Sequence, residues 1–418
     1  MQPTENSFEV IVVGGGASGL MAAGRAAECG KRVLLLEKNT KVGEKLSISG
    51  GGRCNITNAE ENERVLLGHY GGSEKFLYSL FSQFGVKDTF KFFEERGLPL
   101  VVQARKRAFP KTEKAPDVVR VLIDYVQDMG VLVKTKAPVT RVVSHDKRIT
   151  AVQTGKEIYY ADKFVFATGG VSHPETGSTG DGFKWLTDLG HTVSKPTPTI
   201  VPLAVKDLWS KLLAGVSLSY MKVTFFVDGK KSFSLKGKIL FTHFGISGPL
   251  ILNAASRVAD LLHGGVVTAK IDAYPDTDLG TLEKNIIKVF DANKNKEFKN
   301  IVKECIPKGM HKGILKLISV EMDITKKIHS ISKDERKYLV QLLKELPLTI
   351  DGLMGFDRAV VADGGVPLGE IDMRTMRSKI IENLYVTGDL LHINRPSGGY
   401  SLQLCWTTGY VAGSHACE

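Results

Sequence analysis

Near the start of the chain, hydrophobic and polar positions alternate in a pattern that predicts three elements in a fixed order. Residues 8–13 (FEVIVV) are an apolar run rich in β-branched side chains, which is typical of a buried strand. The glycine turn 14–19 (GGGASG) follows, and then an alanine-rich segment with helical spacing at 20–29. A second apolar run, 32–36, ends at the acid Glu37. This order predicts a βαβ unit of the kind that binds a dinucleotide.

The residues of the turn have separate tasks in such a site. Gly14 permits the tight turn, Gly16 lets a pyrophosphate approach the backbone, and Gly19 lets the helix pack closely on the strand. Ala17 and Ser18 lie in the first turn of the helix, whose free N–H groups and positive dipole attract phosphates. The turn is therefore expected to hold the pyrophosphate.

Three later features narrow the choice of dinucleotide. Glu37, which precedes Lys38, is expected to accept hydrogen bonds from both ribose hydroxyls and to repel a 2′-phosphate, so NADP is disfavoured. Residues 163–170 (KFVFATGG) read as a strand running into Ala-Thr-Gly, and residues 383–391 (NLYVTGDLL) as a strand running into Gly-Asp. Both resemble segments of large FAD-binding enzymes, in which the acid of the Gly-Asp pair, here Asp389, binds the ribityl chain. The sequence therefore predicts FAD.

Helical and strand-like patterns along the rest of the chain predict a discontinuous domain. Helical spacing at 74–96 and 115–130 precedes strand-like runs at 131–143 and 149–158, and composition shifts at 195–199 (KPTPT). We expect an α/β fold: a Rossmann-like FAD-binding domain of the glutathione-reductase type, interrupted by an inserted β-rich and helical region. The predicted boundaries are 1–195 for the first part of the FAD domain, 196–345 for the insertion with its helical piece at about 275–340, and 346–418 for the second part.

Two glycine-rich segments are expected to surround the flavin. Residues 41–58 (KVGEKLSISGGGRCNITN) have no apolar period and are predicted to be a long functional loop, in which Arg53 pairs with the pyrophosphate. Residues 398–403 (GGYSLQ) open the last helix, whose N-terminus is expected to stabilise negative charge on the flavin pyrimidine. The residues predicted to bind FAD are Gly14, Gly16, Ala17, Ser18, Gly19, Glu37, Lys38, Lys45, Ser49, Gly51, Gly52, Arg53, Cys54, Asn55, Val139, Thr168, Gly169, Gly388, Asp389, Gly398, Gly399, Tyr400 and Ser401.

Candidates for contact with a substrate are fewer. Tyr400 is the first choice as a hydrogen-bond or proton donor, because it lies where the last helix begins, and Ser397 and His243 are the other catalytic candidates. His173 and His392 also lie in glycine-rich loops, where a single histidine is more often structural. No second strand–GxGxxG–helix–acid unit occurs, so a nicotinamide donor, if used, is expected to bind transiently at the flavin face.

Composition limits the class of protein and its partners. The chain has 418 residues, 43% of them hydrophobic, and no apolar run near the roughly 20 residues that cross a bilayer. Its polar start (MQPTENS) and five scattered cysteines without CxxC predict neither a targeting peptide nor a metal site, and they favour a cytoplasmic location. The net charge of +11 is interpreted as a solvated surface, because basic residues interleaved with aromatic ones are not evident. We expect a small-molecule substrate, with no nucleic acid and no stable membrane insertion. The positive field and the turn that contains Arg395 favour an anionic substrate.

Several motifs together resemble one family over essentially the full length. The segments GGGASGLMAA, LSISGGGRCNITN, TGSTGDG, FTHFGISGP and GGYSLQ are similar to those of the bacterial FAD-binding flavoproteins that include aminoacetone oxidases and bile-acid-inducible 3-dehydro-bile-acid reductases. The resemblance implies non-covalent FAD and a substrate region inserted as a β-barrel-like and helical piece. Where many relatives have Gly-Glu, this chain has Gly388-Asp389, and its turn 392–397 (HINRPS) also departs from theirs.

The resemblance leaves two activities open. In the first, hydride passes from flavin N5 to a C=C bond conjugated to a ketone, as in a steroid or bile-acid intermediate of the 3-dehydro-Δ4,6 type. In the second, FAD oxidises a small amine such as aminoacetone and oxygen is reduced to hydrogen peroxide. The first is the prediction and the second the alternative, with a non-enzymatic redox sensor as a third. Neither the electron donor nor the oligomeric state follows from the sequence.

Overall fold

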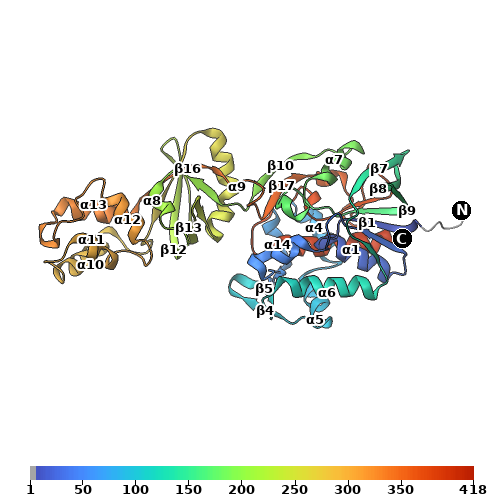
Figure 1. Ribbon diagram of the computed structural model, residues 1–418, viewed down its shortest axis with the longest axis horizontal. Helices are drawn as coiled ribbons and strands as arrows, with labels where there is room; N and C mark the ends of the chain where they lie inside the picture. Colours follow the sequence, from blue (N-terminus) through green and yellow to red (C-terminus); the bar gives the residue numbers. More distant parts are fainter. Residues whose placement is uncertain (1–5) are drawn as a thin grey trace. The chain divides into compact units, whose positions relative to one another are not determined.

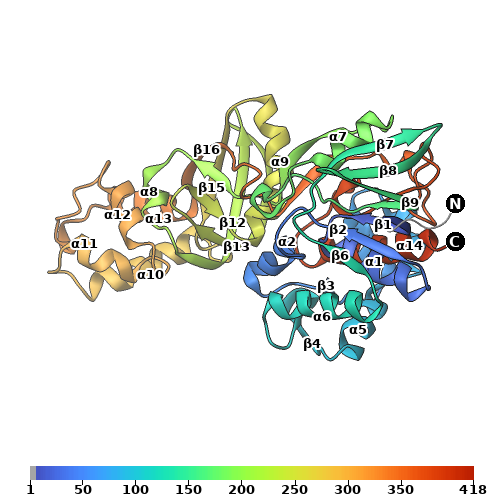
Figure 2. The same cartoon turned by 45° about the vertical axis from the view of Figure 1, so that its right-hand side comes forward.

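The computed structural model describes residues 6–418, which form two compact units (Figures 1 and 2). The first unit comprises the chain up to Pro198 together with Val360–Glu418, and the second comprises Thr199–Ala359. The second boundary lies later than the predicted 345/346, because the strand β16 (Leu346–Leu353) pairs with strands of the second unit.

A seven-stranded sheet forms the centre of the first unit. Its strands follow the order β6-β2-β1-β9-β8-β7, and β18 also pairs with β9. Strand β1 runs parallel to both β2 and β9, as a βαβ unit requires. The bounds are β1 Ser7–Val13, β2 Val33–Leu36, β6 Leu132–Lys134, β7 Val139–His145, β8 Arg148–Thr154, β9 Glu157–Phe166 and β18 Leu384–Val386.

Two helices pack closely against each other beside this sheet. They are α1 (Ala17–Glu28) and α14 (Tyr400–Ala416). A Cβ on Gly409 would lie 2.4 Å from the carbonyl oxygen of Ser18, and one on Gly413 would lie 2.5 Å from that of Ala22. Only glycine at these two positions, one helical turn apart, permits the observed approach of the helices.

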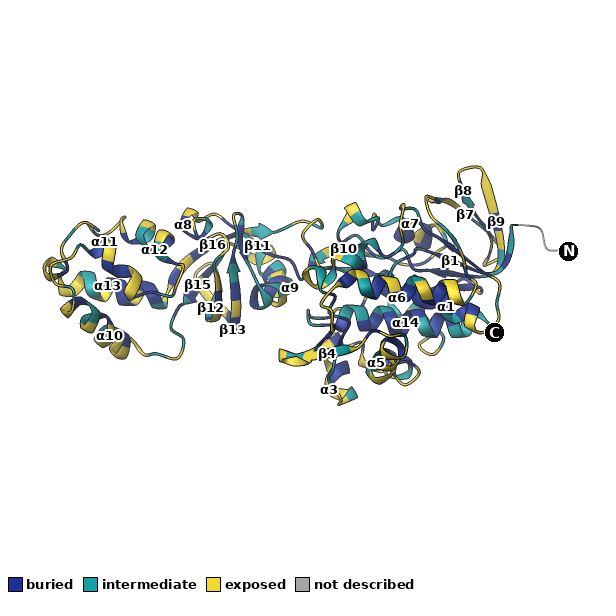
Figure 3. Ribbon diagram, turned by 60° about the horizontal axis from the view of Figure 1, so that its bottom comes forward, coloured by how far each residue is buried: buried dark blue, intermediate teal, exposed yellow. Residues whose placement is uncertain are grey.

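Apart from α6, the remaining elements of the first unit are short. Figure 3 shows α6 (Ala115–Asp128) with one buried and one exposed face, as its helical spacing predicts. The predicted helix at 74–96 is divided into two, and the segment predicted as a loop at 41–58 contains a short helix. The bounds are α2 Glu44–Ile48, α3 Glu63–Leu67, α4 Glu74–Phe81, α5 Val86–Glu95, α7 Asp181–Asp188, β3 Thr57–Asn58, β4 Leu100–Gln103, β5 Arg107–Pro110, β10 Ser194–Thr199 and β17 Val361–Gly365.

The second unit is a closed barrel with a helical extension. The strands close in the order β11-β14-β13-β12-β15-β16, and β16 returns to β11. Inward-facing Val223, Phe225, Ile239 and Phe241 fill the interior, and the helices inserted between β15 and β16 continue this core. The bounds are β11 Leu203–Val205, α8 Leu208–Lys211, β12 Ser217–Val227, β13 Lys230–Phe241, β14 Gly245–Ser247, α9 Pro249–Gly264, β15 Val267–Asp272, α10 Leu279–Asp291, α11 Phe298–Ile301, α12 His311–Ile318 and α13 Lys333–Lys344. None of the helices in residues 6–418 is long and apolar enough to cross a membrane.

Candidate cofactor site

The glycine turn and Glu37 lie together at the end of β1. The Glu37 side chain is buried, and its carboxylate accepts hydrogen bonds from the backbone N–H groups of Gly15 at 2.7 Å and Asn39 at 2.8 Å. Gly14 has φ +106°, and a Cβ there would lie 2.5 Å from the carbonyl oxygen of Ala167. The turn therefore requires glycine, and it presents a fixed carboxylate beside the start of α1.

The first turn of α1 contains backbone N–H groups that are free to donate hydrogen bonds to a ligand. Gly16 precedes the helix without a side-chain cap, and the first intrahelical hydrogen bond runs from the Leu20 N–H to the Gly16 carbonyl at 2.9 Å. The N–H groups of the first turn, at Ala17, Ser18 and Gly19, have no partner within the helix. A Cβ on Gly16 would meet nothing within 4 Å, so an anion has room to approach. This arrangement suits a pyrophosphate.

The strand ends of β9 and β18 adjoin this turn. Thr168 and Gly169 follow β9, and a Cβ on Gly388 would lie 2.9 Å from the Ser18 hydroxyl. The Gly388 N–H donates to Thr408 of α14 at 3.1 Å. The two segments predicted from ATG and GD thus adjoin the first turn of α1, although they are far apart in sequence.

The loop that follows β2 provides both open space and an unsatisfied polar atom. Gly51 and Gly52 have φ +69° and +86°, and a Cβ on either would meet nothing within 4 Å. The Asn55 Oδ1 atom is buried and has no hydrogen-bond partner among the described residues. Buried polar atoms are normally hydrogen-bonded, so we expect this oxygen to accept a hydrogen bond from a bound ligand.

Two ionisable side chains in this region are affected by burial. Burial raises the pKa of the Cys54 thiol to about 12, so the thiol stays protonated and is a poor nucleophile for covalent attachment of a flavin. Burial lowers the pKa of Lys45, with nearby Asp389 opposing this effect. The Lys45 amino group donates a hydrogen bond to the Ser172 hydroxyl at 3.2 Å, and it forms no ion pair with a carboxylate of residues 6–418. An anionic ligand would stabilise the charge of this lysine.

The start of α14 is held against β3. A Cβ on Gly399 would lie 2.3 Å from the carbonyl carbon of Thr57, and Gly399 has φ +104°. The Gln403 side-chain oxygen accepts hydrogen bonds from Thr57 at 2.6 Å and Thr89 at 3.0 Å. Gly398 and Gly399 leave the first-turn N–H groups of α14 without a side-chain cap, as at α1.

Tyr400 is the first residue of α14 and is largely buried. Its ring lies 4.9 Å from that of His69 and 5.8 Å from that of Tyr70, and its carbonyl accepts a hydrogen bond from the Tyr70 hydroxyl at 2.9 Å. Burial raises the pKa of Tyr400. The phenol therefore stays protonated near neutral pH and is able to donate a hydrogen bond.

Arg395 forms an ion pair within its own turn and does not present its charge to a substrate. Its buried guanidinium is paired with the Asp389 carboxylate, and it also donates to the Ile393 carbonyl at 2.7 Å and to the Ser401 hydroxyl at 3.1 Å. The turn at 392–397 was interpreted as favouring an anionic substrate. That interpretation is wrong for Arg395, because its charge is neutralised within the turn, where it orients Asp389 and Ser401.

Several predicted residues are engaged elsewhere. Arg53 forms an ion pair with Glu113 at 3.1 Å and lies over the ring of Phe109, instead of pointing to the glycine turn as expected. Lys38 forms an ion pair with Asp181 at 2.7 Å, at the start of α7. His243 belongs to the other unit, in the exposed loop between β13 and β14.

Three further predicted residues, Val139, Ser49 and Ser397, belong to the first unit. Val139 begins β7, and the loop before it is tied to the Glu37 carbonyl by the Ala137 N–H at 2.9 Å. Ser49 accepts a hydrogen bond through its carbonyl from the Cys54 N–H at 3.0 Å, which closes the glycine loop. Ser397 lies in the loop just before Gly398, within the same unit as Tyr400.

Sequence reasoning missed the side chains that position this site. Thr57, Thr89 and Gln403 fix the last helix, and Thr387 and Thr408 fix the Gly388 turn. Their residue types carry no signal, since threonine and glutamine occur throughout the chain. The Asp389–Arg395 pair had a weak signal, an acid and a base six residues apart in one glycine- and proline-containing turn.

A comparison with family models identifies the fold family. Residues 8–415 match the model described as HI0933-like protein Rossmann domain. The chain belongs to this family. It has the predicted Rossmann-like FAD-binding fold and is an FAD-dependent oxidoreductase.

Known relatives cover nearly the whole chain. A 3-dehydro-bile acid delta(4,6)-reductase of Clostridium scindens is 28% identical over 410 residues, which are 97% of this chain and 98% of the relative. A ribosomal RNA dihydrouridine synthase of Haemophilus influenzae is 28% identical over 407 residues, 96% of this chain and 97% of the relative. Among solved structures, a 3-ketosteroid-delta4-(5alpha)-dehydrogenase of Rhodococcus jostii RHA1 has the same fold, with a TM-score of 0.54 and 14% identity, covering 100% of this chain and 98% of the other.

The residues of the first unit suit FAD. The Gly14–Gly19 turn, the uncapped start of α1 and Glu37 suit the ADP half, and the Gly388 turn adjoins them. The unpartnered Asn55 oxygen and the open space at Gly51 and Gly52 offer a place for the rest of the cofactor. The assignment of individual residues to parts of FAD stays a prediction.

Proposed function

We propose that this flavoprotein reduces a C=C bond conjugated to a carbonyl group in a ring of its substrate. The observation that carries the proposal is the full-length similarity to two kinds of enzyme whose names share this chemistry. A Δ4,6 bond in a 3-dehydro-bile acid is conjugated to the 3-oxo group. In a dihydrouridine synthase, the C5=C6 bond of uracil, which is conjugated to a carbonyl, becomes saturated.

The chain's own groups suit this reaction. When bound, reduced FAD supplies a hydride to the β-carbon of the conjugated system, and the α-carbon takes a proton from an acid or from water. Tyr400, protonated and at the start of α14, is the proposed donor of a hydrogen bond or proton to the substrate. The uncapped start of α14 offers N–H groups to negative charge that develops during turnover.

Electrons have to come from a donor that binds in turn with the substrate. We propose a reduced nicotinamide, NAD(P)H, which gives a hydride to FAD and leaves as NAD(P)+. The chain has a single predicted strand–GxGxxG–helix–acid unit, so donor and acceptor would use the flavin face one after the other. Ping-pong kinetics are the expected sign of this order.

Two substrates with this chemistry are supported by different observations. A 3-oxo-Δ4 or Δ4,6 steroid or bile acid is the substrate that the sequence resemblance predicted, and the Clostridium relative supports it. A uracil base in RNA is supported by the two ribosomal RNA dihydrouridine synthases and by the excess of positive charge in residues 199–359. These observations count against the expectation that the protein has no nucleic-acid partner, and RNA is therefore included among the proposed substrates.

An anaerobic rapid-mixing experiment tests the reaction. The holoenzyme is reduced, and a 3-oxo-Δ4,6 bile acid or a uridine-containing RNA is added. Return of the oxidised flavin band with either compound supports conjugated C=C reduction and selects the substrate. If neither reoxidises the flavin, while aminoacetone reduces the oxidised enzyme and oxygen then yields peroxide, the amine-oxidase alternative replaces the proposal.

A further inference from the structure

The second unit carries most of the net charge of the chain. Residues 199–359 contain 25 of the 56 lysines and arginines but only 17 of the 45 acidic residues, a net charge of +8 out of +11. The cofactor site lies in the other unit, which is nearly balanced. Such asymmetry points to a polyanionic partner for the barrel and its helical extension.

One barrel strand arranges basic and aromatic side chains on its outer face. In β12, Met221, Val223 and Phe225 are buried inside the barrel. The alternate residues Tyr220, Lys222, Thr224 and Phe226 therefore face outward, because successive strand residues point to opposite faces. This is the interleaving of aromatic and basic residues that the sequence analysis did not find. It becomes visible only once the strand and its register are known.

Lysines on the neighbouring strands flank this outward row. Lys222 is paired in register with Lys236 of β13, Thr224 with Lys270 of β15, and Phe226 with Lys231 of β13. The Lys270 ammonium lies 5.5 Å from the centre of the Phe226 ring, and that of Lys236 lies 5.5 Å from the Tyr220 ring. Lys222 and Lys236 face each other in register, and Lys236 forms an ion pair with Asp276 at 3.0 Å. The charge of this pair that has no acidic partner among the described residues is therefore that of Lys222.

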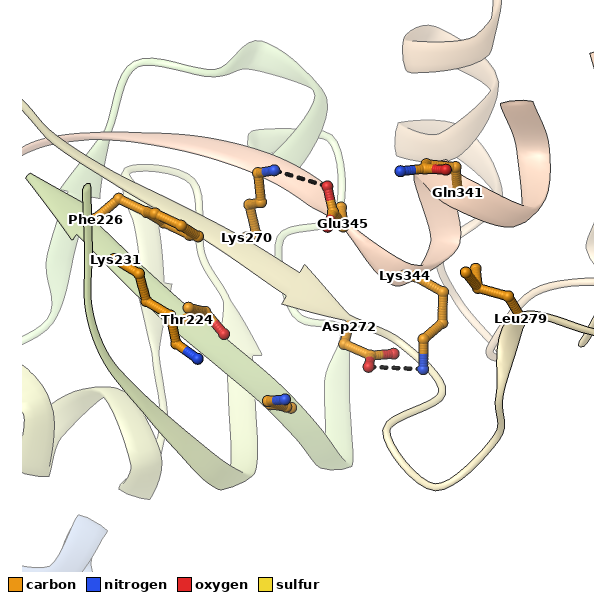
Figure 4. A pocket seen from close by; sticks show the side chains of 10 residues that line it. Thr224, Phe226, Lys231, Lys270, Asp272, Leu279, Gln341, Lys344 and Glu345 are labelled. Carbon is orange, nitrogen blue, oxygen red and sulfur yellow. Dashed lines mark hydrogen bonds and ion pairs between the residues drawn. The ribbon is translucent and has the colours of Figure 1, made fainter. Parts of the chain in front are cut away.

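A groove of about 320 Å³ lies along this face (Figure 4). We call it the lysine groove. In Figure 4 Thr224, Phe226 and Lys231 lie on one side of the pocket, and Gln341 of α13 and Leu279 of α10 lie on the other. It is lined by Lys222, Thr224, Phe226, Lys231, Lys270, Asp272, Leu279, Gln341, Lys344 and Glu345.

Half of the lysines in the groove are already neutralised. Lys270 forms an ion pair with Glu345 at 2.7 Å, and Lys344 forms one with Asp272 at 2.7 Å. Lys222 and Lys231 have no acidic partner within 4.0 Å among residues 6–418. These two ammonium groups are available to a ligand anion. Phe226 lies opposite Lys231 in register and four residues from Lys222 along β12.

We propose that the lysine groove binds a single-stranded segment of RNA. Phosphates would contact Lys222 and Lys231, while a base would stack on the ring of Phe226. Tyr220 lies about 20 Å further along β12 and would take a base several nucleotides away. Lysines along the backbone path combined with exposed aromatic rings are the features by which proteins hold single-stranded nucleic acid. This inference rests on the proposed function, and it selects RNA over a free steroid as the substrate that the second unit presents.

Binding of the full-length holoenzyme to a fluorescent uridine-rich RNA of about 20 nucleotides tests the groove, with fluorescence anisotropy measured over a range of salt. The double variant K222Q/K231Q should bind more weakly, and its slope of log affinity against log salt should fall by about 1.4, since each phosphate contact contributes about 0.7. The matched control K312Q/K316Q removes two exposed lysines from α12 of the same unit. It should leave the slope nearly unchanged.

The aromatic part has its own pair of variants. F226L removes the stacking face but keeps an apolar side chain, and affinity should fall about fivefold or more. Y220F keeps its ring and should bind as the natural protein does. Unchanged far-UV circular dichroism and unchanged FAD content establish that the variants are folded. The groove is ruled out if K222Q/K231Q and K312Q/K316Q weaken binding equally, or if F226L binds normally.

RNA binding and RNA-dependent reoxidation of the flavin are measured separately, so that the two proposals can fail independently. If the groove variants bind RNA normally while RNA still reoxidises the reduced flavin, the lysine groove is wrong and the proposed reaction stands. If K222Q/K231Q alone weakens binding but RNA never reoxidises the flavin, the groove stands and RNA is not the compound that is reduced. A fall in both binding and RNA-dependent reoxidation in K222Q/K231Q supports both proposals.

Discussion

Glu37 is the residue on which binding of the ADP half is expected to depend most. Its carboxylate is buried, fixed by two backbone N–H groups and directed to the glycine turn. Glu37→Ala should weaken FAD binding by about 1–3 kcal/mol, the scale of charge-assisted hydrogen bonds. Titration of the apoprotein with FAD, followed by flavin fluorescence, measures the change. Glu61→Ala, which removes an exposed carboxylate from the same unit, serves as control, and equal affinities for the two variants would exclude Glu37 from the site.

Lys45 links the cofactor site to the stability of the apoprotein. Because burial lowers its pKa in the folded protein, the unfolded chain binds more protons between the folded and unfolded pKa values, and stability rises with pH in that window. Lys45→Met should raise the free energy of unfolding of the apoprotein by about 1 kcal/mol at neutral pH and remove this rise, while it weakens FAD binding. Urea unfolding at neutral and alkaline pH provides the measurement. A variant that is less stable at both pH values would contradict the assignment.

Tyr400 is expected to act on the substrate more than on the cofactor. Tyr400→Phe keeps the ring contacts with His69 and Tyr70 but removes the hydroxyl. Reoxidation of the reduced flavin by the substrate should slow by about 100-fold or more, the scale of a lost general acid, with FAD affinity unchanged. Rapid mixing gives the rate and titration gives the affinity. An unchanged rate would transfer the donor role to water or to another side chain.

Individual residues differ in how far the sequence reveals their roles. Gly14, Gly19 and Glu37 are predictable because spacing alone fixes what the backbone must do at each position. Arg395 is not, because its partner Asp389 is decided by the path of a turn. The same holds for Arg53, which pairs with Glu113 from a separate segment.

At the level of elements, the close contact between β3 and α14 positions Gly398 and Gly399, which are predicted to bind the flavin. Gly399→Ala would place a Cβ 2.3 Å from the Thr57 carbonyl carbon at φ +104°, so it should destabilise the protein by about 2 kcal/mol or more and lower its FAD content. Gly97→Ala is the matched control, since Gly97 has φ +77° but open space around the added Cβ. It should cost about 1 kcal/mol of backbone strain alone. Urea midpoints that agree for the two variants would show that the close contact is unimportant.

Elements with strong local patterns are the ones that the sequence predicts. The β1-α1-β2 unit, α6 and α14 were expected because each has an apolar period bounded by glycine or by a charged residue. The short helix α2 was missed, since five residues are too few to establish a helical period. Closure of the barrel could not be predicted from the sequence either. It depends on the pairing of β16 with β11, and these two strands lie far apart in the sequence.

On the scale of the whole molecule, the FAD-binding fold and most of the net positive charge belong to different units. The unit that contains the FAD fold is nearly neutral, whereas residues 199–359 carry the positive excess on a barrel and its helices. From the sequence alone, the net charge of +11 is interpreted as a solvated surface. The outward register of β12 changes that interpretation, because a register is a tertiary property that the pattern of one strand does not reveal.

The central claim, reduction of a conjugated C=C bond, is tested most directly by the product of one turnover. Reduced holoenzyme is mixed under anaerobic conditions with a uridine-containing RNA and, separately, with a 3-oxo-Δ4,6 bile acid, and the products are analysed by mass spectrometry. The account predicts that one of them gains two hydrogens at the conjugated double bond, in an amount equal to the flavin reoxidised. Recovery of both compounds unchanged, with the flavin still reduced, would contradict it.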